Sequence, residues 1–132
     1  MADEVGTGLQ VELVAADRTV WSGEASMVIA RTTEGDLGVL PGHAPLLSLL
    51  TEAAVEISSV EGVVHAAVDG GFLSVAGDRV SILTEHALLA EEIKIDEAKA
   101  ALEAAEGMPT GDERELHLRR AQARIRAAEK AG

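Results

Sequence analysis

Short apolar segments recur along the first two thirds of the chain and are separated by turn residues. Leu9, Val11 and Leu13 alternate with polar side chains, which is the period of two expected for a strand with one solvated face. A turn signal such as Gly77-Asp78 joins neighbouring segments into a hairpin. Further strands are predicted at residues 25–29, 46–50, 53–57, 63–68, 72–76 and 80–83, with turns at 22–23, 33–36, 61–62 and 69–71. About eight or nine short antiparallel strands predict a β-sandwich or a flattened barrel.

The hydrophobic period changes near Ile95, where apolar positions begin to recur every three to four residues. Asp96 is placed to cap the first helix, and Gly107 is placed to end it. Thr110 and Asp112 are competing caps for a second helix that follows at once. Two short helices with so brief a connection predict an antiparallel hairpin.

The change of period predicts two domains, a β-sandwich over residues 1–92 and a two-helix C-terminal domain over residues 93–132. The charge divides the chain in a similar way. Residues 1–111 hold five Lys or Arg against nineteen Asp or Glu, a net charge of −14, whereas residues 112–132 hold six against four, a net charge of +2. These basic side chains either keep the last helix soluble or contact an acidic partner. Four of them form two pairs, each on one helix face: Arg120 with Arg124, and Arg119 with Arg126.

Composition argues against several classes of site. The chain has no cysteine, which excludes disulfides, thiolate nucleophiles and thiolate metal ligands. A net charge of −12 argues against binding a nucleic-acid backbone, which requires many basic side chains. The sequence contains neither a Gly-x-Ser-x-Gly elbow nor a glycine-rich phosphate loop. The histidines are scattered and lack metal-ligand spacing: His43, His65, His86 and His117.

Membrane association is expected only through partners. The longest uncharged stretch, Leu37–Thr51, contains two prolines and is shorter than the roughly 20 residues that span a bilayer. Residues Met1–Gly8 include two acidic side chains where an export signal would need a basic start.

The segment from Gly38 to Leu47 predicts a docking surface. Pro41 and Pro45 fix backbone dihedrals within a stretch of five residues, so an uncharged loop is held rigidly at a low cost in entropy. The alternative is an internal crossover between the two sheets, in which His43 is only a turn residue. The candidate interface comprises Leu37, Gly38, Val39, Leu40, Pro41, Gly42, His43, Ala44 and Pro45.

This loop belongs to a pair of motifs. It is preceded by Thr33-Glu34-Gly35-Asp36 and followed by Gly70-Gly71-Phe72-Leu73-Ser74-Val75. The two motifs, at this separation, resemble the paired signatures of the bacterial epsilon subunit of the rotary F-type ATP synthase. The order of a strand-rich region and then a helical hairpin agrees with that family, and the resemblance extends from about Leu9 to Lys130.

The resemblance implies a non-catalytic subunit in the central stalk of the proton-translocating ATP synthase, peripheral to the cytoplasmic side of the cell membrane. In the proteins it resembles, the sandwich binds the gamma subunit and the ring of c subunits. The hairpin either folds on the sandwich or extends toward the catalytic beta subunits, and the extended form restrains ATP hydrolysis. We therefore expect an inhibitory contact made by Arg119, Arg120, Arg124 and Arg126.

Some members of that family bind a regulatory ATP on the hairpin, and the resemblance implies such a site at Asp96, Lys99, Arg120 and Arg124. Lys99 stands where the family motif has Arg, and a lysine lacks the bidentate fork that suits phosphate. Acidic Glu103 or Glu106 occupies a further position that is basic in the family. Capping accounts for Asp96 without a nucleotide. No other cofactor is expected.

Two other classes remain open at the level of sequence. One is a small hydrolase on a β-sandwich, and the other is a stand-alone binding module with a ligand cavity between its sheets. Neither accounts for the basic terminal hairpin, and a filled sandwich interior would count against both.

Overall fold

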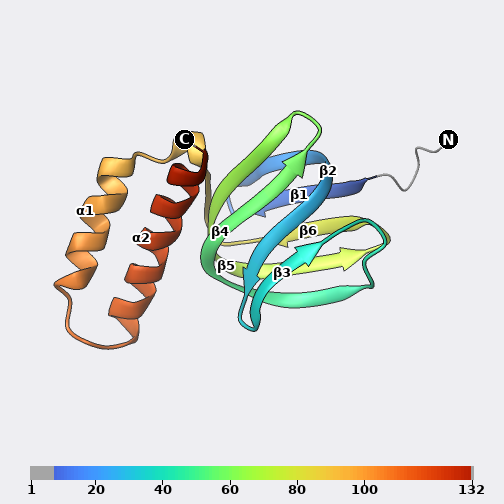
Figure 1. Ribbon diagram of the computed structural model, residues 1–132. Helices are drawn as coiled ribbons and strands as arrows, with labels where there is room; N and C mark the ends of the chain where they lie inside the picture. The colour runs from blue at the N-terminus through green and yellow to red at the C-terminus, as the bar shows by residue number, and fades with distance from the viewer. Residues whose placement is uncertain (1–7, 132) are drawn as a thin grey trace.

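The computed structural model describes residues 8–131, which form a strand-rich body followed by two packed helices (Figure 1). The predicted absence of an export signal falls almost wholly on residues 1–7, outside the described part. Seven strands, one short 3-10 helix and two α-helices follow one another along residues 8–131: β1 (Leu9–Ala15), β2 (Arg18–Thr32), β3 (Gly35–Val39), β4 (Leu46–Ser59), β5 (Gly62–Ala76), β6 (Arg79–Leu83), β7 (Ala87–Leu89), η1 (Ala90–Glu92), α1 (Ile95–Glu106) and α2 (Asp112–Ala131).

The strands form a sheet that closes on itself. Their order is β1-β6-β5-β4-β2-β3, β7 pairs with β5, and an additional pairing between β1 and β2 completes the circuit. All pairs are antiparallel except β1 with β6. Long strands bend between the two layers, so the closed sheet is flattened into a sandwich with its core inside (Figure 1). The predicted fold class, a β-sandwich followed by a helical hairpin, is confirmed.

The core is aliphatic, as expected from a chain with one Trp and one Phe. Trp21 only packs against the edge of the core, and Phe72 is 48% exposed. Alternating side chains of β1 point inward, which explains the period of two at Leu9, Val11 and Leu13. The largest fully buried side chains fill the interior between the layers: Leu9, Leu13, Ile57, Leu73 and Ile82. A filled interior counts against a ligand cavity between the sheets.

Several predicted short strands are halves of longer ones. Residues 46–50 and 53–57 both lie in β4, and residues 63–68 and 72–76 both lie in β5. The turn predicted at 22–23 is wrong, because those residues pair with β1 within β2. The expected eight or nine strands are therefore seven over residues 8–131. The Gly77-Asp78 hairpin is confirmed, with both residues at positive φ as a type I′ turn requires.

The Asp69-Gly70-Gly71 sequence is a bend inside β5 and not the predicted strand end. Gly71 has φ +116°, and a Cβ added there would lie 2.0 Å from the carbonyl oxygen of Leu83 on β6. Only glycine allows both this conformation and this close approach. The bend lets one strand present Asp69 to the helices and Phe72 to another surface.

The two helices form an antiparallel hairpin, and α2 is the helix that lies against the sandwich (Figure 1). Alanine side chains make the apolar part of this contact: Ala67 on β5 is buried together with Ala123 and Ala127. The three predicted helix caps, Asp96 for α1 and Thr110 or Asp112 for α2, all lie off the N-cap positions. Lys94 occupies the N-cap of α1 without a side-chain cap bond, so Asp96 lies in the first turn, and Gly111 supplies the carbonyl that begins α2.

No helix between residues 8 and 131 is long and apolar enough to cross a lipid bilayer.

Candidate functional site

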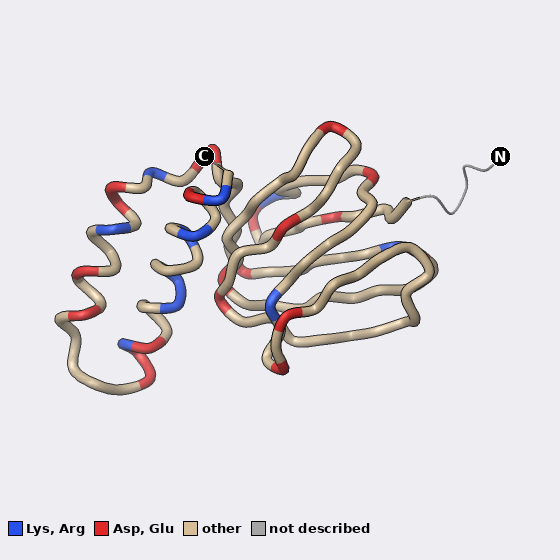
Figure 2. Tube along the Cα trace, in the orientation of Figure 1, with Lys and Arg blue, Asp and Glu red and all other residues tan. Residues whose placement is uncertain are grey.

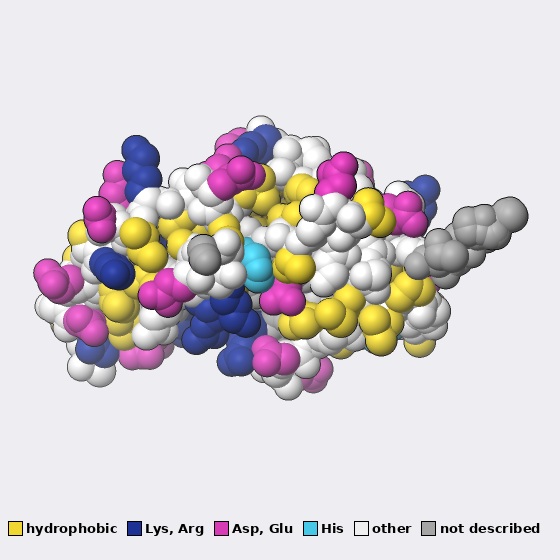
Figure 3. All heavy atoms as spheres, turned by 45° about the horizontal axis from the view of Figure 1, so that its top comes forward, with side chains coloured by type: hydrophobic (Ala, Val, Ile, Leu, Met, Phe, Trp, Pro, Cys, Tyr) yellow, Lys and Arg dark blue, Asp and Glu magenta, His cyan; other side chains and the backbone are white. Residues whose placement is uncertain are grey.

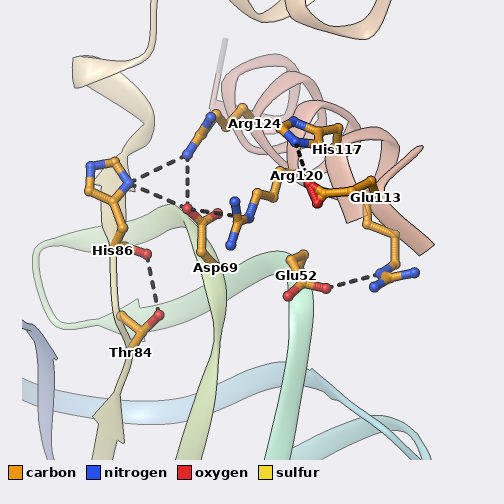
Figure 4. A network of polar contacts seen from close by, with 9 residues as sticks. Glu52, Asp69, Thr84, His86, Glu113, His117, Arg120 and Arg124 are labelled. Atoms are coloured by element: carbon orange, nitrogen blue, oxygen red, sulfur yellow. Dashed lines mark hydrogen bonds and ion pairs between the residues drawn. The ribbon is translucent and has the colours of Figure 1, made fainter. Parts of the chain in front are cut away.

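Asp69 is the centre of a polar cluster between α2 and the sheet (Figure 4). Its side chain is only 8% exposed. Arg124 Nη2 donates a hydrogen bond of 3.0 Å to Asp69 Oδ2, and Arg120 Nε lies 3.8 Å from the same oxygen. His86 Nδ1 lies 3.5 Å from it on the other side. One nearly buried carboxylate therefore faces two arginines and a histidine, which offset its desolvation.

Glu52 forms a second contact beside the first. It lies directly opposite Asp69 in the β4–β5 register, and its side chain is 14% exposed. Arg119 Nε donates a hydrogen bond of 2.9 Å to Glu52 Oε1. Two carboxylates facing each other across adjacent strands repel. The arginines of α2 supply the opposing positive charge, so the burial of each carboxylate and of the arginine paired with it costs less free energy.

The arginines of α2 thus do not all extend into solvent. Figure 2 shows blue positions recurring along the last helix on the side near the sandwich, and Figure 3 shows Lys and Arg side chains gathered where the helices meet it. Arg119, Arg120 and Arg124 contact the sheet carboxylates. Arg126 lines a hollow of about 370 Å³ between α2 and β2–β4. The structure therefore brings together three of the four arginines predicted for the inhibitory contact.

A further ion pair ties the segment before the hairpin to the sandwich. Arg18 on β2 donates two hydrogen bonds to the Glu92 carboxylate, at 2.8 and 2.7 Å. The Leu89 backbone N–H donates another, at 2.8 Å. The hydrogen bonds from Arg18 chiefly, and the one from Leu89, hold the pKa of Glu92 below its usual value.

The candidate docking loop runs between β3 and β4 and is anchored by its neighbours. Gly42 N donates a hydrogen bond of 2.7 Å to Asp78 Oδ1 in the β5–β6 turn, and His43 N donates to the Leu40 carbonyl. Leu37 and Val39 point toward the core, whereas Leu40 is 56% exposed. The predicted surface therefore contains residues that anchor the loop to the sandwich and residues, such as Leu40, that are exposed at the surface.

Comparison with known proteins decides the family. The model of the beta-sandwich domain of the ATP synthase delta/epsilon chain matches residues 8–90. The ATP synthase epsilon chain of Streptomyces griseus is 54% identical over 120 residues, covering 90% of this chain and 94% of that protein. The chain belongs to the ATP synthase delta/epsilon family. The epsilon chain of Thermobifida fusca is also similar, 50% identical over 129 residues, with 94% of each protein covered.

Chains in two solved ATP synthase structures share the architecture. A chain in the mitochondrial ATP synthase of Euglena gracilis, an OSCP/F1/c-ring structure, aligns with a TM-score of 0.81 and 25% identity over 98% of this chain and 86% of that one. A chain in the central stalk/c-ring structure from Tetrahymena thermophila aligns with a TM-score of 0.63 over 93% of this chain and 95% of that one. At 16% identity the second match shows the fold alone.

The four residues at which the family resemblance implied a nucleotide do not converge in this structure. Arg120 and Arg124 are directed at Asp69. Asp96 and Lys99 are exposed on α1, and Asp96 lies about 200° around the helix from buried Ala98. A hollow of about 430 Å³ beside α1 is lined by Arg124 but by none of the other three. The ATP site stays a prediction.

An exposed apolar row on the sandwich was not predicted from the sequence. Leu49 on β4 lies opposite Phe72 on β5, which lies opposite Leu83 on β6. These three side chains and Leu47 are each about half exposed or more. Leu47 is the last residue of the docking segment that begins at Gly38, so the row continues the loop surface. The signal was present in the sequence. Consecutive large apolar residues, such as Leu46-Leu47 and Leu49-Leu50, place apolar side chains on both faces of a strand, which is typical of a strand covered on both faces.

Proposed function

We propose that this chain is a non-catalytic subunit of the central stalk of the proton-translocating ATP synthase. In this role it links the gamma subunit to the c ring, and its C-terminal hairpin restrains ATP hydrolysis by the catalytic beta subunits. The complex holds it at the cytoplasmic side of the cell membrane. The observation that carries the proposal is the whole-length similarity to proteins named ATP synthase epsilon chain.

The loop and the apolar row support the docking part of the proposal. Leu40, Leu47 and Phe72 are large apolar side chains held at the surface by a proline-containing loop and a paired sheet. An exposed contiguous apolar patch on a rigid scaffold is typical of a protein interface. The similar chains belong to an OSCP/F1/c-ring structure and a central stalk/c-ring structure, which indicates the class of partner.

The hairpin supports the regulatory part. Its contact with the sandwich is made of alanines and ion pairs, and not of large interlocking side chains. Alanine buries little apolar area, so the docked position has a modest hydrophobic advantage over a released one. A hairpin held in this way can exchange between two positions.

The docking test is a single substitution in the loop. Leu40→Asp places a carboxylate at the proposed contact, where an unpaired buried charge typically costs several kcal/mol. We expect the variant to fold normally, because Leu40 is exposed in the free chain, and to bind a gamma–c-ring assembly at least about 100-fold more weakly. Affinity is measured by titrating labelled chain into purified complex that lacks this subunit.

Val60→Asp is the matched control. Val60 is 82% exposed in the β4–β5 turn, so the same change alters the same kind of surface away from the loop. Unchanged binding by both variants would leave the loop as an internal crossover and remove the docking role.

A further inference from the structure

Three arginines of α2 are used inside the docked chain. Arg119 contacts Glu52, and Arg120 and Arg124 contact Asp69. The two carboxylates are neighbours across β4 and β5, and their side chains are 14% and 8% exposed. They form a compact acidic pair on the sandwich, covered by the arginine face of α2 (Figure 4).

The rest of the α2 contact offers little to replace this pair. Ala67, Ala123 and Ala127 are buried together, with Ala54 and Ile93 packed at their edge. Each alanine contributes one methyl group. Apolar burial therefore allows α2 to approach the sheet closely but adds little free energy to the docked position. Arg120 also keeps its buried Nε without a hydrogen-bond partner in the described part of the chain. Its contact with Asp69 at 3.8 Å is therefore a charge interaction.

We infer that Glu52 and Asp69 form a docking site for the arginine face of α2, which consists of Arg119, Arg120 and Arg124. The two carboxylates compete for these arginines with the acidic surface of the catalytic beta subunits. The competition rests on the proposed function, in which the released hairpin grips that surface with the same arginines. While α2 is docked, these three arginines lie against the sandwich and not at the surface of the catalytic beta subunits. The sandwich thus carries an acidic site that imitates the partner, and the hairpin is either docked or inhibitory.

Competition for the arginines of α2 predicts effects on ATP hydrolysis that a simple packing contact does not. Removing the sheet carboxylates releases the hairpin and leaves its arginines intact, so inhibition deepens. Removing the arginines also releases the hairpin but takes away its grip, so inhibition weakens. Both changes break the same contacts, and they move ATP hydrolysis in opposite directions.

Docking is measured first in the free, full-length chain. The chain has no cysteine, so Val60→Cys and Thr110→Cys introduce two unique sites for spin labels, one in the β4–β5 turn and one in the loop between the helices. Glu52→Gln with Asp69→Asn should raise the fraction of widely separated labels about fivefold or more over the labelled parent. Glu12→Gln, which neutralises an exposed carboxylate on β1, should leave the distance distribution unchanged.

Charge reversal distinguishes a specific contact from general loosening. Glu52→Lys alone should release the hairpin, because it faces Arg119 with a like charge. Adding Arg119→Glu restores an opposite pair at the same place and should return the labels to the docked distance. In the reconstituted complex this double variant has a glutamate in place of Arg119, an arginine proposed to contact the catalytic beta subunits. Its rate of ATP hydrolysis should therefore exceed that of the parent.

The two readouts separate this inference from the proposed function. Release by the carboxylate variants together with slower ATP hydrolysis supports both. Release in the free chain with unchanged hydrolysis supports the docking site and removes the inhibitory role of the hairpin. A docked distance in the Glu52→Gln, Asp69→Asn variant, or no rescue by Arg119→Glu, overturns the inference whatever the rates of hydrolysis are.

Discussion

Asp69 and Gly71 lie two residues apart in β5 and give the strand its two surfaces. Asp69 points to the arginines of α2, whereas the bend at Gly71 turns the next residues toward the exposed row that contains Phe72. Because Gly71 has a positive φ and lies against the Leu83 carbonyl, backbone geometry at one position decides where both side chains point.

We expect Gly71→Ala to destabilise the chain by about 2–4 kcal/mol, because its Cβ would meet backbone and not a movable side chain. Urea unfolding of wild type and variant measures the change. Gly77→Ala is the control, since Gly77 also has a positive φ but has no atom within 4 Å of an added Cβ. It should cost only about 1 kcal/mol. Equal losses for the two variants would show that the close approach at Gly71 contributes nothing.

At the scale of elements, the segment from β7 to α1 is fastened to the sandwich before the hairpin begins. The Arg18–Glu92 pair joins β2 to the end of η1, three residues before α1 starts. This ion pair sets the point at which the chain leaves the sandwich for the hairpin. It shares no residue with the contacts that α2 makes with the sheet.

The lowered pKa of Glu92 predicts a dependence of stability on pH. A carboxylate whose pKa is lower in the folded state stabilises above its unfolded pKa of about 4.3, and that contribution is lost as the pH falls through the folded value. The melting temperature of wild type should therefore exceed that of Glu92→Gln at pH 5.5, and the difference should shrink as the pH falls below about 4.3. Glu91→Gln, a change at the adjacent exposed position, controls for the loss of one negative charge. A constant difference between wild type and Glu92→Gln across this range would contradict the assignment.

Elements were predictable where the sequence pattern is local. The period of two in β1 and the period near 3.6 in α1 and α2 each identify the right kind of element. The continuity of β4 and β5 was not predictable, because Gly70-Gly71 has the composition of a turn and becomes a bend only when β6 pairs alongside. The Asp96 cap was also predicted wrongly. The N-cap of α1 is Lys94, two residues before Asp96, so the best capping residue lies inside the first turn.

The candidate site was half visible in the sequence. The arginines of α2 were found because six Lys or Arg gather in the last 21 residues of an acidic chain. Their partners Glu52 and Asp69 were not found, since they meet only through the β4–β5 register and through the packing of α2. The domain boundary at residues 92 and 93 stays a prediction.

At the scale of the whole molecule, the sandwich and the hairpin contribute separate parts of the proposed function. The main core is formed entirely by residues from Leu9 to Leu89, so it lies within the strands. The hairpin adds the small alanine contact and the contacts with Glu52 and Asp69. A chain lacking the hairpin loses none of the main core.

Ending the chain before Asp96 should therefore leave the sandwich folded and able to assemble, and should raise ATP hydrolysis by the reconstituted complex. The truncated chain keeps Arg18 and Glu92, and water hydrates the two carboxylates that α2 had covered. Replacing Arg119, Arg120, Arg124 and Arg126 with Ala should raise hydrolysis partially. Exposed ion pairs contribute about 0–1 kcal/mol each, so several must act together in the inhibitory contact, and apolar contacts of the hairpin survive the replacement.

The decisive comparison is the ATPase rate with full-length, truncated and four-Arg-to-Ala chains, measured beside the melting temperature of each free chain. Equal rates with all three would remove the inhibitory role. A drop of more than about 10 °C in the melting temperature on truncation would make the hairpin a brace for the sandwich, because a domain of this size loses 4–8 °C for about 1 kcal/mol. The position of the main core outside the helices favours the first outcome over the brace: the hairpin leaves, the sandwich stays folded, and hydrolysis rises.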